Sequence, residues 1–344
     1  MRVLQLTGPK QLAWHEAPTP SLASDVAAIV RPIAVASCDL DWPLVAGELP
    51  FPYPVTLGHE FVGIVTDIGD EVARVNVGDR VVVAFQPSCG HCAPCRRGTT
   101  SACTSVPKTS MYGVGSVGGE WGGAIADFVA VPFADHMCVV LPANVKSVAA
   151  VSAGDNLADA HRMIAPHLVK APESVLIAGG LASIPLYALL FAKALGINEV
   201  SFASAERAAL DHAEQLGANC LELEKPDRRL GRFDLVVDCA NQAELLHTLI
   251  RCVNPGGVCA SASMYFEGDV KLPLYEMYMK GVSFHTGRVD SSAHLNEIVA
   301  LLRDGVVDPL LVDTSIDDWE HAPTVFAERR TAKAIVVRDE GGSV

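Results

Sequence analysis

Short runs of β-forming residues fill the first part of the chain. Up to about residue 150, apolar and β-branched stretches such as 27–30, 61–65 and 80–83 are interrupted by Gly and Pro. Many short strands separated by turn residues predict a barrel-like β domain.

A second pattern begins near residue 155, where apolar strands alternate with helices. Strands are expected at 174–178, 199–203, 233–238 and 257–260, and helices at 186–195 and 206–216. This alternation predicts a parallel sheet covered by helices on both faces. A helix at 294–303 and a last strand at 334–337 are expected to return to the first domain.

Together the two patterns predict an α/β protein with two domains. We assign residues 1–153 and 290–344 to the β-rich domain, with a small lobe at about 87–105, and residues 154–289 to a doubly wound domain. A chain of 344 residues is long enough for each domain to have its own core.

Charge and composition narrow the range of partners. Asp and Glu number 40 against 26 Lys and Arg, so the formal net charge is −14. Such a surface repels phosphate backbones and anionic lipid, and we expect neither nucleic acid nor a membrane as a partner. Residues 1–6 resemble a strand rather than a signal peptide, and the apolar run 181–192 is shorter than the roughly 20 residues that span a bilayer. We therefore expect a cytoplasmic protein whose cysteines are thiols or metal ligands.

Four cysteines give the clearest chemical signal. Cys89, Cys92, Cys95 and Cys103 have the spacing C-x2-C-x2-C-x7-C. Short spacings direct neighbouring thiolates at one ion, and four sulfurs close a tetrahedral shell, which predicts a structural zinc ion without an open position. An iron–sulfur cluster also uses four cysteines and is the main alternative. A thioredoxin-like redox pair needs only two cysteines that open a helix.

His59 marks a second candidate centre. It stands in Gly58-His59-Glu60 at the entry to a strand, where a lone His is more often a hydrogen-bonded structural residue. Its context changes that interpretation, because Cys38 lies upstream and the four-cysteine lobe lies downstream. This order resembles the zinc-dependent alcohol dehydrogenases of the medium-chain dehydrogenase/reductase family over essentially the whole chain. The resembling stretches are Gly58-His59-Glu60-x-x-Gly63-x-Val65, the cysteine lobe, 192–196 and 332–337.

The resemblance implies both a fold and an activity. The fold would be a GroES-like, β-barrel-type catalytic domain followed by a Rossmann nucleotide-binding domain. The activity would be that of a zinc-dependent, NAD(P)-linked alcohol dehydrogenase or carbonyl reductase with two zinc ions per chain, paired as a homodimer or homotetramer. Hydride would pass between nicotinamide C4 and a small alcohol or carbonyl compound. The alternative is a zinc- and dinucleotide-binding protein of the same fold with little or no dehydrogenase turnover.

The same resemblance implies the ligands of the catalytic zinc ion. Matched residue by residue they are Cys38, His59 and Asp155, and three protein ligands leave a fourth position for water or substrate. Asp155 is alternatively a helix cap. Glu60 is expected next to the ligands, and Asp41 is expected to orient His59.

Two residues depart from the family pattern. The usual Ser or Thr two residues after the ligand Cys is Leu40, which cannot relay a proton, and the usual Thr four residues after the third ligand is Asp159. The proton then leaves through water, the cofactor ribose, Asp39 or Asp159, or turnover is slow. Family position also suggests Trp42, Tyr112 and Trp121 as walls of a substrate cleft.

A glycine-containing turn predicts the dinucleotide site. Gly179, Gly180 and Leu181 follow the strand at 174–178, and glycines at such a turn let backbone N–H groups approach a pyrophosphate. The G-x-G-x-x-G pattern is incomplete, with Pro185 near the place of its third glycine.

The end of the next strand bears on the choice between NAD and NADP. Ser204 stands where an Asp or Glu would bind the ribose hydroxyls of NAD, and Arg207 follows as a candidate partner for a 2′-phosphate. These two residues favour NADP over NAD. Lys333 matches a basic family position that contacts the pyrophosphate.

Overall fold

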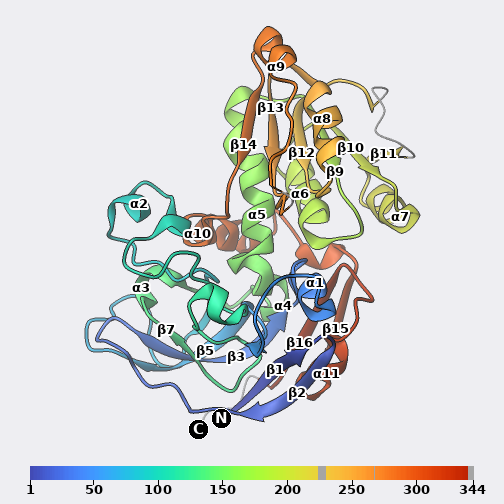
Figure 1. The fold of residues 1–344 in the computed structure, drawn as a ribbon. Coiled ribbons are helices and arrows are strands. Elements are labelled where there is room, and N and C mark those ends of the chain that lie inside the picture. The colour runs from blue at the N-terminus through green and yellow to red at the C-terminus, as the bar shows by residue number, and fades with distance from the viewer. Residues whose placement is uncertain (224–229, 267, 340–344) are drawn as a thin grey trace. The chain divides into compact units, whose positions relative to one another are not determined.

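The protein is an α/β chain of two compact units. The structure is a computed structural model that describes residues 1–223, 230–266 and 268–339 (Figure 1). Unit 1 contains Met1–Ala158 and Val289–Val344, and unit 2 contains Asp159–Arg288. The sequence pattern places the first domain boundary between residues 153 and 154, whereas the boundary between the two units falls after Ala158, within helix α5 (Asn156–Ile164). Asp155 therefore belongs to unit 1.

Unit 1 is built on two sheets. The larger sheet has the order β15-β16-β3-β5-β6-β8, with β7 paired to β3, and the smaller has the order β2-β1-β4. The strands are β1 (Arg2–Gly8), β2 (Gln11–Glu16), β3 (Ala28–Ala36), β4 (Val55–Thr56), β5 (Glu60–Ile68), β6 (Arg80–Val83), β7 (Val129–Val131), β8 (Cys138–Val140), β15 (Thr314–Asp318) and β16 (Lys333–Val337).

Mostly short helices connect these strands, and α10 is the longest of them in unit 1. The α-helices are α1 (Asp41–Ala46), α2 (Ala93–Arg96), α3 (Ala134–Met137), α4 (Ser147–Ala150), α10 (Ser291–Arg303) and α11 (Ala322–Val325). The 3-10 helices are η1 (Thr100–Ala102), η2 (Gly115–Gly118), η3 (Val151–Gly154), η6 (Pro309–Leu311) and η7 (Trp319–His321).

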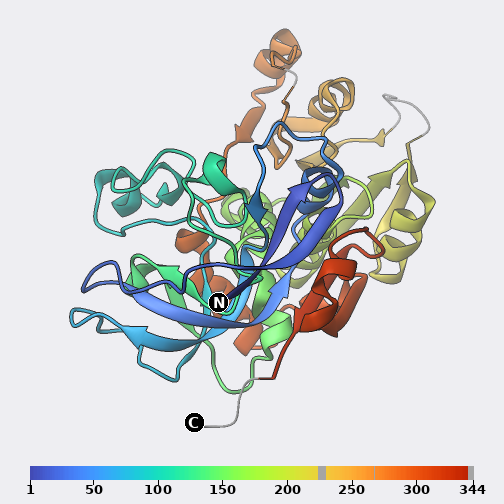
Figure 2. The same cartoon turned by 60° about the horizontal axis from the view of Figure 1, so that its bottom comes forward.

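The C-terminal segment returns to the first sheet, as the sequence predicts. β16 pairs antiparallel with β3, and Ile335 lies opposite Ala36. β3 in turn pairs antiparallel with β5, and Ala36 lies opposite Glu60. Figure 2 shows the first strands, in blue, beside the last elements, in red. One end of the sheet thus collects residues that are distant in the sequence.

Unit 2 contains a six-stranded parallel sheet of order β11-β10-β9-β12-β13-β14. The strands are β9 (Ser174–Ala178), β10 (Glu199–Ser204), β11 (Asn219–Glu222), β12 (Phe233–Asp238), β13 (Val253–Ser261) and β14 (Ser283–Thr286). The helices are α6 (Ser183–Ala194), α7 (Arg207–Gln215), α8 (Ala243–Arg251), α9 (Leu274–Lys280) and η4 (Ala165–Lys170). This strand order and helix alternation are those of the predicted Rossmann fold.

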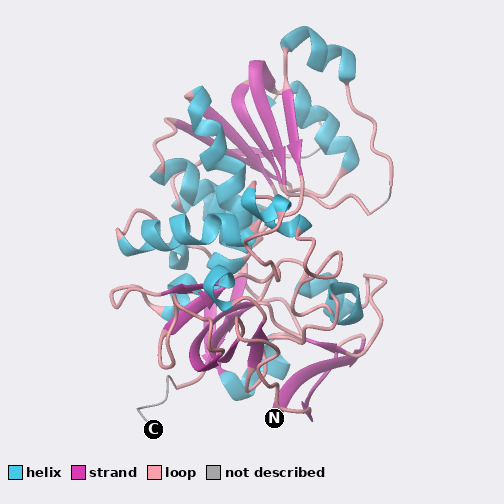
Figure 3. Ribbon diagram, turned by 90° about the vertical axis from the view of Figure 1, so that its left-hand side faces the viewer, coloured by secondary structure: helices cyan, strands magenta, loops and turns pink. Residues whose placement is uncertain are grey.

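Hydrophobic burial explains why unit 2 folds this way. Every residue of β9 is buried, because helices cover both faces of the parallel sheet (Figure 3). On α8 the buried Leu245, Leu246 and Leu249 recur at helical spacing and pack on the sheet.

Among the described residues, no helix is both long enough and apolar enough to cross a membrane.

Candidate metal centres and nucleotide site

A buried cluster of metal-binding side chains forms where β3 ends and β5 begins. Cys38 follows β3, His59 and Glu60 lie at the start of β5, and Asp155 lies directly before α5. The antiparallel register with Ala36 opposite Glu60 places the first two segments side by side. All four side chains are buried, and each offers a ligand atom within 4.8 Å of the others. The structure thus brings together Cys38, His59 and Asp155, with Glu60 as a fourth member.

A glycine turn directs His59 into this cluster. Gly58 adopts φ +92°, and an added Cβ would lie 2.8 Å from the backbone nitrogen of Ile125. An L-residue side chain therefore fits neither the backbone conformation nor the space. The turn is held by the N–H of Ala124, which donates to the Gly58 carbonyl (2.7 Å).

Two carboxylates flank the imidazole ring. His59 Nε2 lies 3.2 Å from Asp155 Oδ2, whereas Nδ1 lies 3.9 Å from Asp41 Oδ1. The other oxygen of Asp41 accepts the backbone N–H of Cys38 at 2.8 Å. Asp41 thus holds the thiol-bearing turn and lies on the Nδ1 side of the ring, but its Oδ1 makes no hydrogen bond to Nδ1, so its role in orienting His59 stays a prediction.

Asn156 is a member of this site that sequence reasoning missed. It is fully buried, and the Cys38 thiol donates a hydrogen bond to its Oδ1 at 3.3 Å. Its one sequence signal was its place beside Asp155 at the start of a helix. Such a position does not by itself distinguish a polar neighbour of the thiol from an ordinary first-turn residue.

Burial makes the charged forms of the acidic side chains in this cluster unfavourable in free energy. Desolvation raises the pKa of Cys38 well above its usual value and raises that of Asp41. Burial also raises the pKa of Glu60 to about 8. Burial opposes protonation of His59, but the surrounding carboxylates, with Asp41 foremost, outweigh it and raise the pKa of His59 to about 9. A divalent cation would lower the cost of this concentration of acidic groups, so the donor set suits a metal ion.

Lys333 is enclosed in the same cluster. Its ammonium group donates to both carboxylate oxygens of Glu60 (3.1 and 2.9 Å) and to the carbonyl of Ser37. Both members of the pair are fully buried. In this structure Lys333 is thus directed to Glu60, and the predicted contact with a pyrophosphate stays a prediction.

The four cysteines of the lobe also converge. Cys89, Cys92, Cys95 and Cys103 offer sulfur atoms within 4.8 Å of one another, and the sulfurs of Cys92 and Cys103 are 3.9 Å apart. That separation is far above a disulfide bond of about 2.05 Å. It is close to the edge, about 3.8 Å, of a tetrahedron with zinc–sulfur bonds of about 2.3 Å.

Backbone N–H groups in this lobe donate hydrogen bonds to the cysteine sulfurs, which favours their thiolate form. The N–H of Cys92 donates to the sulfur of Cys89 (3.3 Å), and the N–H of Ser105 donates to that of Cys103 (3.4 Å). Hydrogen bonds, first from the N–H of Cys95, lower the pKa of Cys92 to about 5. Burial raises the pKa of Cys95 to about 12. The group suits a cation that needs several thiolates at once.

The predicted glycine turn lies at the carboxyl end of β9 in unit 2. Gly179, Gly180 and Leu181 connect β9 to α6, and the N–H of Gly179 donates to the carbonyl of Ala203 (3.1 Å). Pro185 falls in the first turn of α6, where its missing N–H costs no intrahelical hydrogen bond. This loop therefore has the strand–turn–helix setting of a dinucleotide site.

The NADP prediction remains untested, and the structure adds one residue that bears on it, Glu206. Ser204 does end β10, but a carboxylate is not missing from this edge, because Glu206 supplies one two residues later. Its Oε2 accepts the N–H of Leu181 at 2.9 Å. Arg207, the candidate phosphate partner, is instead paired with Asp211 along α7 at 2.6 Å. The sequence prediction missed Glu206 because it considered only Ser204, the residue at the end of the strand, and not the residues that follow it.

Comparisons with known proteins agree with both units. Residues 24–143 match the family model described as alcohol dehydrogenase GroES-like domain, and residues 184–303 match that of zinc-binding dehydrogenase. An L-threonine 3-dehydrogenase of Chelativorans sp. is 30% identical over 302 residues, which cover 82% of this chain and 83% of the relative. The chain belongs to the zinc-dependent medium-chain dehydrogenase family.

Other relatives of this medium-chain dehydrogenase cover nearly its whole length. A probable zinc-binding alcohol dehydrogenase of Mycobacterium tuberculosis is 27% identical over 335 residues, covering 96% of this chain and 85% of that protein. The solved alcohol dehydrogenase of Thermus sp. ATN1 superposes with a TM-score of 0.91 at 28% identity, covering 98% and 99% of the two chains. Membership of this zinc-dependent family makes the protein an oxidoreductase of the dehydrogenase type.

In this medium-chain dehydrogenase Tyr112 is a core residue, contrary to the sequence expectation. It is fully buried, its hydroxyl donates to the carbonyl of Ala130 (2.9 Å), and its ring meets the edge of Phe61. It therefore cannot form the wall of an open cleft. Trp42 and Trp121 are half-buried, and Trp42 stacks on Phe326.

The two departures from the family pattern have different surroundings. Leu40 is half-buried, and its backbone N–H donates to the sulfur of Cys38 at 3.5 Å. Asp159 lies in α5 and forms an ion pair with Arg162 at 2.5 Å. The negative charge introduced at position 159 is therefore compensated on the same helix.

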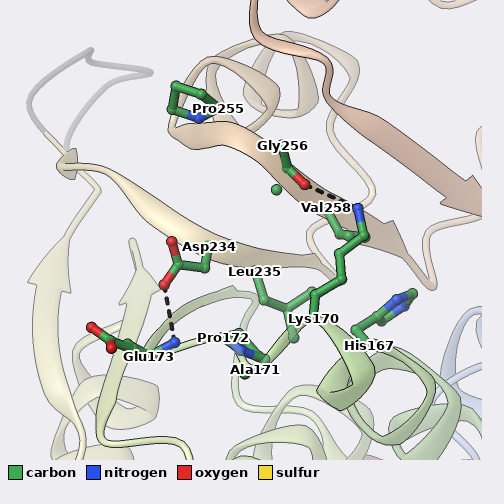
Figure 4. Close-up of a pocket in the computed structure, with 11 residues that line it drawn as sticks. His167, Lys170, Ala171, Pro172, Glu173, Asp234, Leu235, Pro255, Gly256 and Val258 are labelled. Atoms are coloured by element: carbon green, nitrogen blue, oxygen red, sulfur yellow. Dashed lines mark hydrogen bonds between the residues drawn. The ribbon is translucent and has the colours of Figure 1, made fainter.

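A pocket of about 280 Å³ lies at the opposite edge of the unit 2 sheet. It is lined by the amino ends of β9, β12 and β13 and by the end of η4 (Figure 4). Lys170 donates to the carbonyl of Gly256 (2.9 Å), and Asp234 accepts the N–H of Glu173 (3.0 Å). Lys170 and Asp234 are thus engaged in hydrogen bonds that hold the surrounding loops. Cofactors of such sheets bind at the carboxyl ends of the strands, so this pocket is not where the dinucleotide is expected.

Proposed function

We propose that this protein is a zinc-dependent, NAD(P)-linked alcohol dehydrogenase or carbonyl reductase that acts on a small alcohol or carbonyl compound. The convergence of Cys38, His59 and Asp155 in one buried cluster carries this proposal. The second centre, formed by the cysteine lobe, would hold a structural zinc ion. Zinc at the buried cluster would supply Lewis acidity, and a nicotinamide dinucleotide would supply or accept the hydride.

The side chains of the cluster would divide into zinc ligands and residues that position those ligands. With a zinc ion bound, Cys38 and Asp155 would carry the two negative charges that balance a dication, and His59 would complete three protein ligands with one position left for water or substrate. Asp41, on the Nδ1 side of the ring, would orient His59. Glu60, tied to Lys333, keeps a buried carboxylate beside the ligands.

Release of the substrate proton must follow a route that avoids position 40. Leu40 has no polar atom in its side chain, so it neither accepts nor donates a proton. Asp159 is held by Arg162. Water, the cofactor ribose and Asp39 are the remaining carriers that the sequence offers.

The solution assembly is part of the proposal as well. Family resemblance suggests a homodimer or homotetramer paired through unit 2. Helix α9 has no buried residue and exposes Leu274, Tyr275, Tyr278 and Met279. β14 is the edge strand of the sheet. A large exposed apolar patch is typical of a protein–protein interface, and an unpaired edge strand can receive another strand.

A panel of alcohols, aldehydes and ketones tests the proposed chemistry. We expect oxidation of NADH or NADPH with at least one carbonyl compound. Cys38→Ser is expected to lose one of two zinc equivalents and at least a hundredfold in kcat/KM, roughly the size of effect seen when a group stabilising the transition state is removed. Cys220→Ser is the matched control, since Cys220 lies in unit 2 and belongs to neither of the two clusters.

Two results would contradict the dehydrogenase proposal. Unchanged activity and zinc content in Cys38→Ser would remove the catalytic centre. Tight dinucleotide binding without turnover on any carbonyl compound would instead favour the zinc- and dinucleotide-binding protein without dehydrogenase activity.

A further inference from the structure

Three consecutive polar residues at the start of α10 each bond to a different segment of unit 1. They are Asp290, Ser291 and Ser292, and α10 contacts both η1 of the cysteine lobe and η3, which ends directly before Asp155. An aspartate at such a position commonly accepts an N–H of its own first turn, but the side chain of Asp290 forms no such cap. The side chains at this helix start are thus directed to neighbouring segments.

Ser291 fixes the peptide group directly before the proposed zinc ligand Asp155. The side chain of Ser291 is fully buried, and its hydroxyl donates to the carbonyl of Gly154. The same carbonyl accepts the N–H of Phe85, which follows β6, at 3.3 Å. Two donors from different segments therefore hold one oxygen atom, and the next residue along the chain is Asp155.

Close packing adds to this hold on the turn. A Cβ at position 154 would overlap the carbonyl oxygen of Val83, the last residue of β6, so a side chain larger than that of glycine does not fit. The ring of Phe85 lies 5.5 Å from the ring of His59, centroid to centroid. The turn that carries Asp155 is thus packed against the segment that flanks His59, and Ser291 adds an anchor from the C-terminal part of the chain.

Asp290 and Ser292 connect the same helix start to the cysteine lobe. Oδ1 of Asp290 accepts the N–H of Ser101, in η1, at 2.8 Å. The hydroxyls of Ser292 and Ser88 share a buried hydrogen bond of 3.1 Å, and Ser88 directly precedes Cys89. The lobe is therefore attached to α10 near both its first and its last cysteine.

We propose that Ser291 is a positioning residue for the zinc ligand Asp155. Through Asp290 and Ser292, this positioning depends on metal binding in the cysteine lobe. The inference rests on the proposed function, because it needs a zinc ion at the buried cluster. An ordered lobe keeps the start of α10 in place, and the start of α10 keeps the carbonyl before Asp155 in place. Coupling between two binding sites is reciprocal, so each ion strengthens the binding of the other.

Competition with a chelator on the full-length, zinc-loaded protein tests the role of Ser291. The ion of the buried cluster is identified as the one that Cys38→Ser lacks. Ser291→Ala is expected to weaken the binding of this ion roughly ten- to a hundredfold, the usual effect of losing a group that orients a metal ligand. The ion of the lobe is expected to be affected far less.

Cobalt substitution provides a readout that a loss of stability alone would not change. The visible absorption of bound Co²⁺ depends on the geometry of its ligands. We expect the bands of the cluster ion to shift in Ser291→Ala and to match those of the wild-type protein in Ser174→Ala. Ser174 is the matched control, because it is a buried serine of unit 2 whose hydroxyl donates to Asp234 at 3.2 Å.

Emptying the lobe tests the coupling. Cys103→Ser is expected to weaken the binding of the cluster ion roughly fivefold or more, the lower end of typical couplings between sites. In the Ser291→Ala background the same change is expected to add little, because the connection is already broken.

Asp290→Ala provides a second route to this test, since it detaches the lobe but keeps the hydroxyl of Ser291. It is expected to weaken the cluster ion as Cys103→Ser does. Asp308→Ala is its control, because Asp308 accepts the N–H of Leu310 within its own turn (3.0 Å). Asp308→Ala is expected to leave the affinity of the cluster ion unchanged.

Three outcomes would overturn the inference. They are a wild-type affinity of the cluster ion in Ser291→Ala, equal losses in Ser291→Ala and Ser174→Ala, or fully additive losses when Cys103→Ser and Ser291→Ala are combined. These leave the proposed dehydrogenase intact, because the wild-type cluster still binds its ion. A wild-type protein whose buried cluster binds no zinc would overturn the proposed function together with this inference.

Discussion

At the scale of single residues, the buried pair of Lys333 and Glu60 gives the sharpest expectation. Neither side chain has any exposed surface, and their charged groups lie 2.9 Å apart. Lys333→Met would leave Glu60 without its cation. We therefore expect the free energy of unfolding to fall by about 3–5 kcal/mol, the usual loss when one member of a buried pair is removed. Urea denaturation of the zinc-loaded protein measures it.

Two further variants separate charge from packing in this prediction. Adding Glu60→Gln to Lys333→Met is expected to recover part of the loss, since the uncompensated charge is gone. Arg303→Met breaks the exposed pair with Asp304 and is expected to change stability little. A loss for Lys333→Met as small as that of Arg303→Met would show that the buried pair does not stabilise the fold.

At the scale of elements, the cysteine lobe is expected to depend on its metal ion. The short helices α2 and η1 carry or flank its cysteines and have few apolar residues of their own to pack. Cys103→Ser is expected to reduce zinc from two equivalents to one and to lower the thermal unfolding midpoint, because a closed four-ligand site stabilises the segment that it crosslinks. A colorimetric zinc assay after denaturation counts the ions.

Cys220→Ser controls for the loss of a thiol as such, and it should retain two zinc equivalents. Two equivalents in Cys103→Ser would exclude the lobe as a zinc site. Iron and sulfide in the purified wild-type protein would favour the iron–sulfur alternative instead.

At the scale of the whole molecule, the exposed face of α9 is expected to be covered in solution. Tyr278 is 82% exposed in the single chain, with Tyr275 and Met279 beside it on a helix that buries nothing. Light scattering should give the mass of a dimer or tetramer. Tyr278→Glu is expected to shift that mass downward, because a charge placed in an apolar interface must lose its water.

Val169 provides the comparison for this test. It is 88% exposed and lies in η4 of the same unit, so Val169→Glu adds the same charge elsewhere on the surface. We expect its mass to equal that of the wild-type protein. A monomeric wild-type protein, or equal effects of the two substitutions, would rule out α9 as the interface.

Local patterns in the sequence determined much of this protein. The strands at 174–178 and 233–238 have the predicted bounds, since a buried parallel strand must be a continuous apolar run. The lobe of four cysteines was also predictable, because short spacings act within a few residues, whereas His59 became a candidate ligand only through the order of the neighbouring motifs. Family membership then followed from the order of these motifs, and the comparisons confirm it.

The tertiary structure decided what depends on residues far apart in the chain. Lys333 forms its ion pair with Glu60 because β16 pairs with β3 and β3 pairs with β5. The sequence near either residue does not predict this strand register. Tyr112 became a core residue by the same kind of long-range packing. Glu206 reached the glycine turn because two parallel strands end together, which a count along β10 alone could not show. The spacing of apolar residues and of cysteines can be read within a short segment of sequence. The partner of a buried charge such as Lys333, or of a turn, depends instead on which strands pair in the folded sheet.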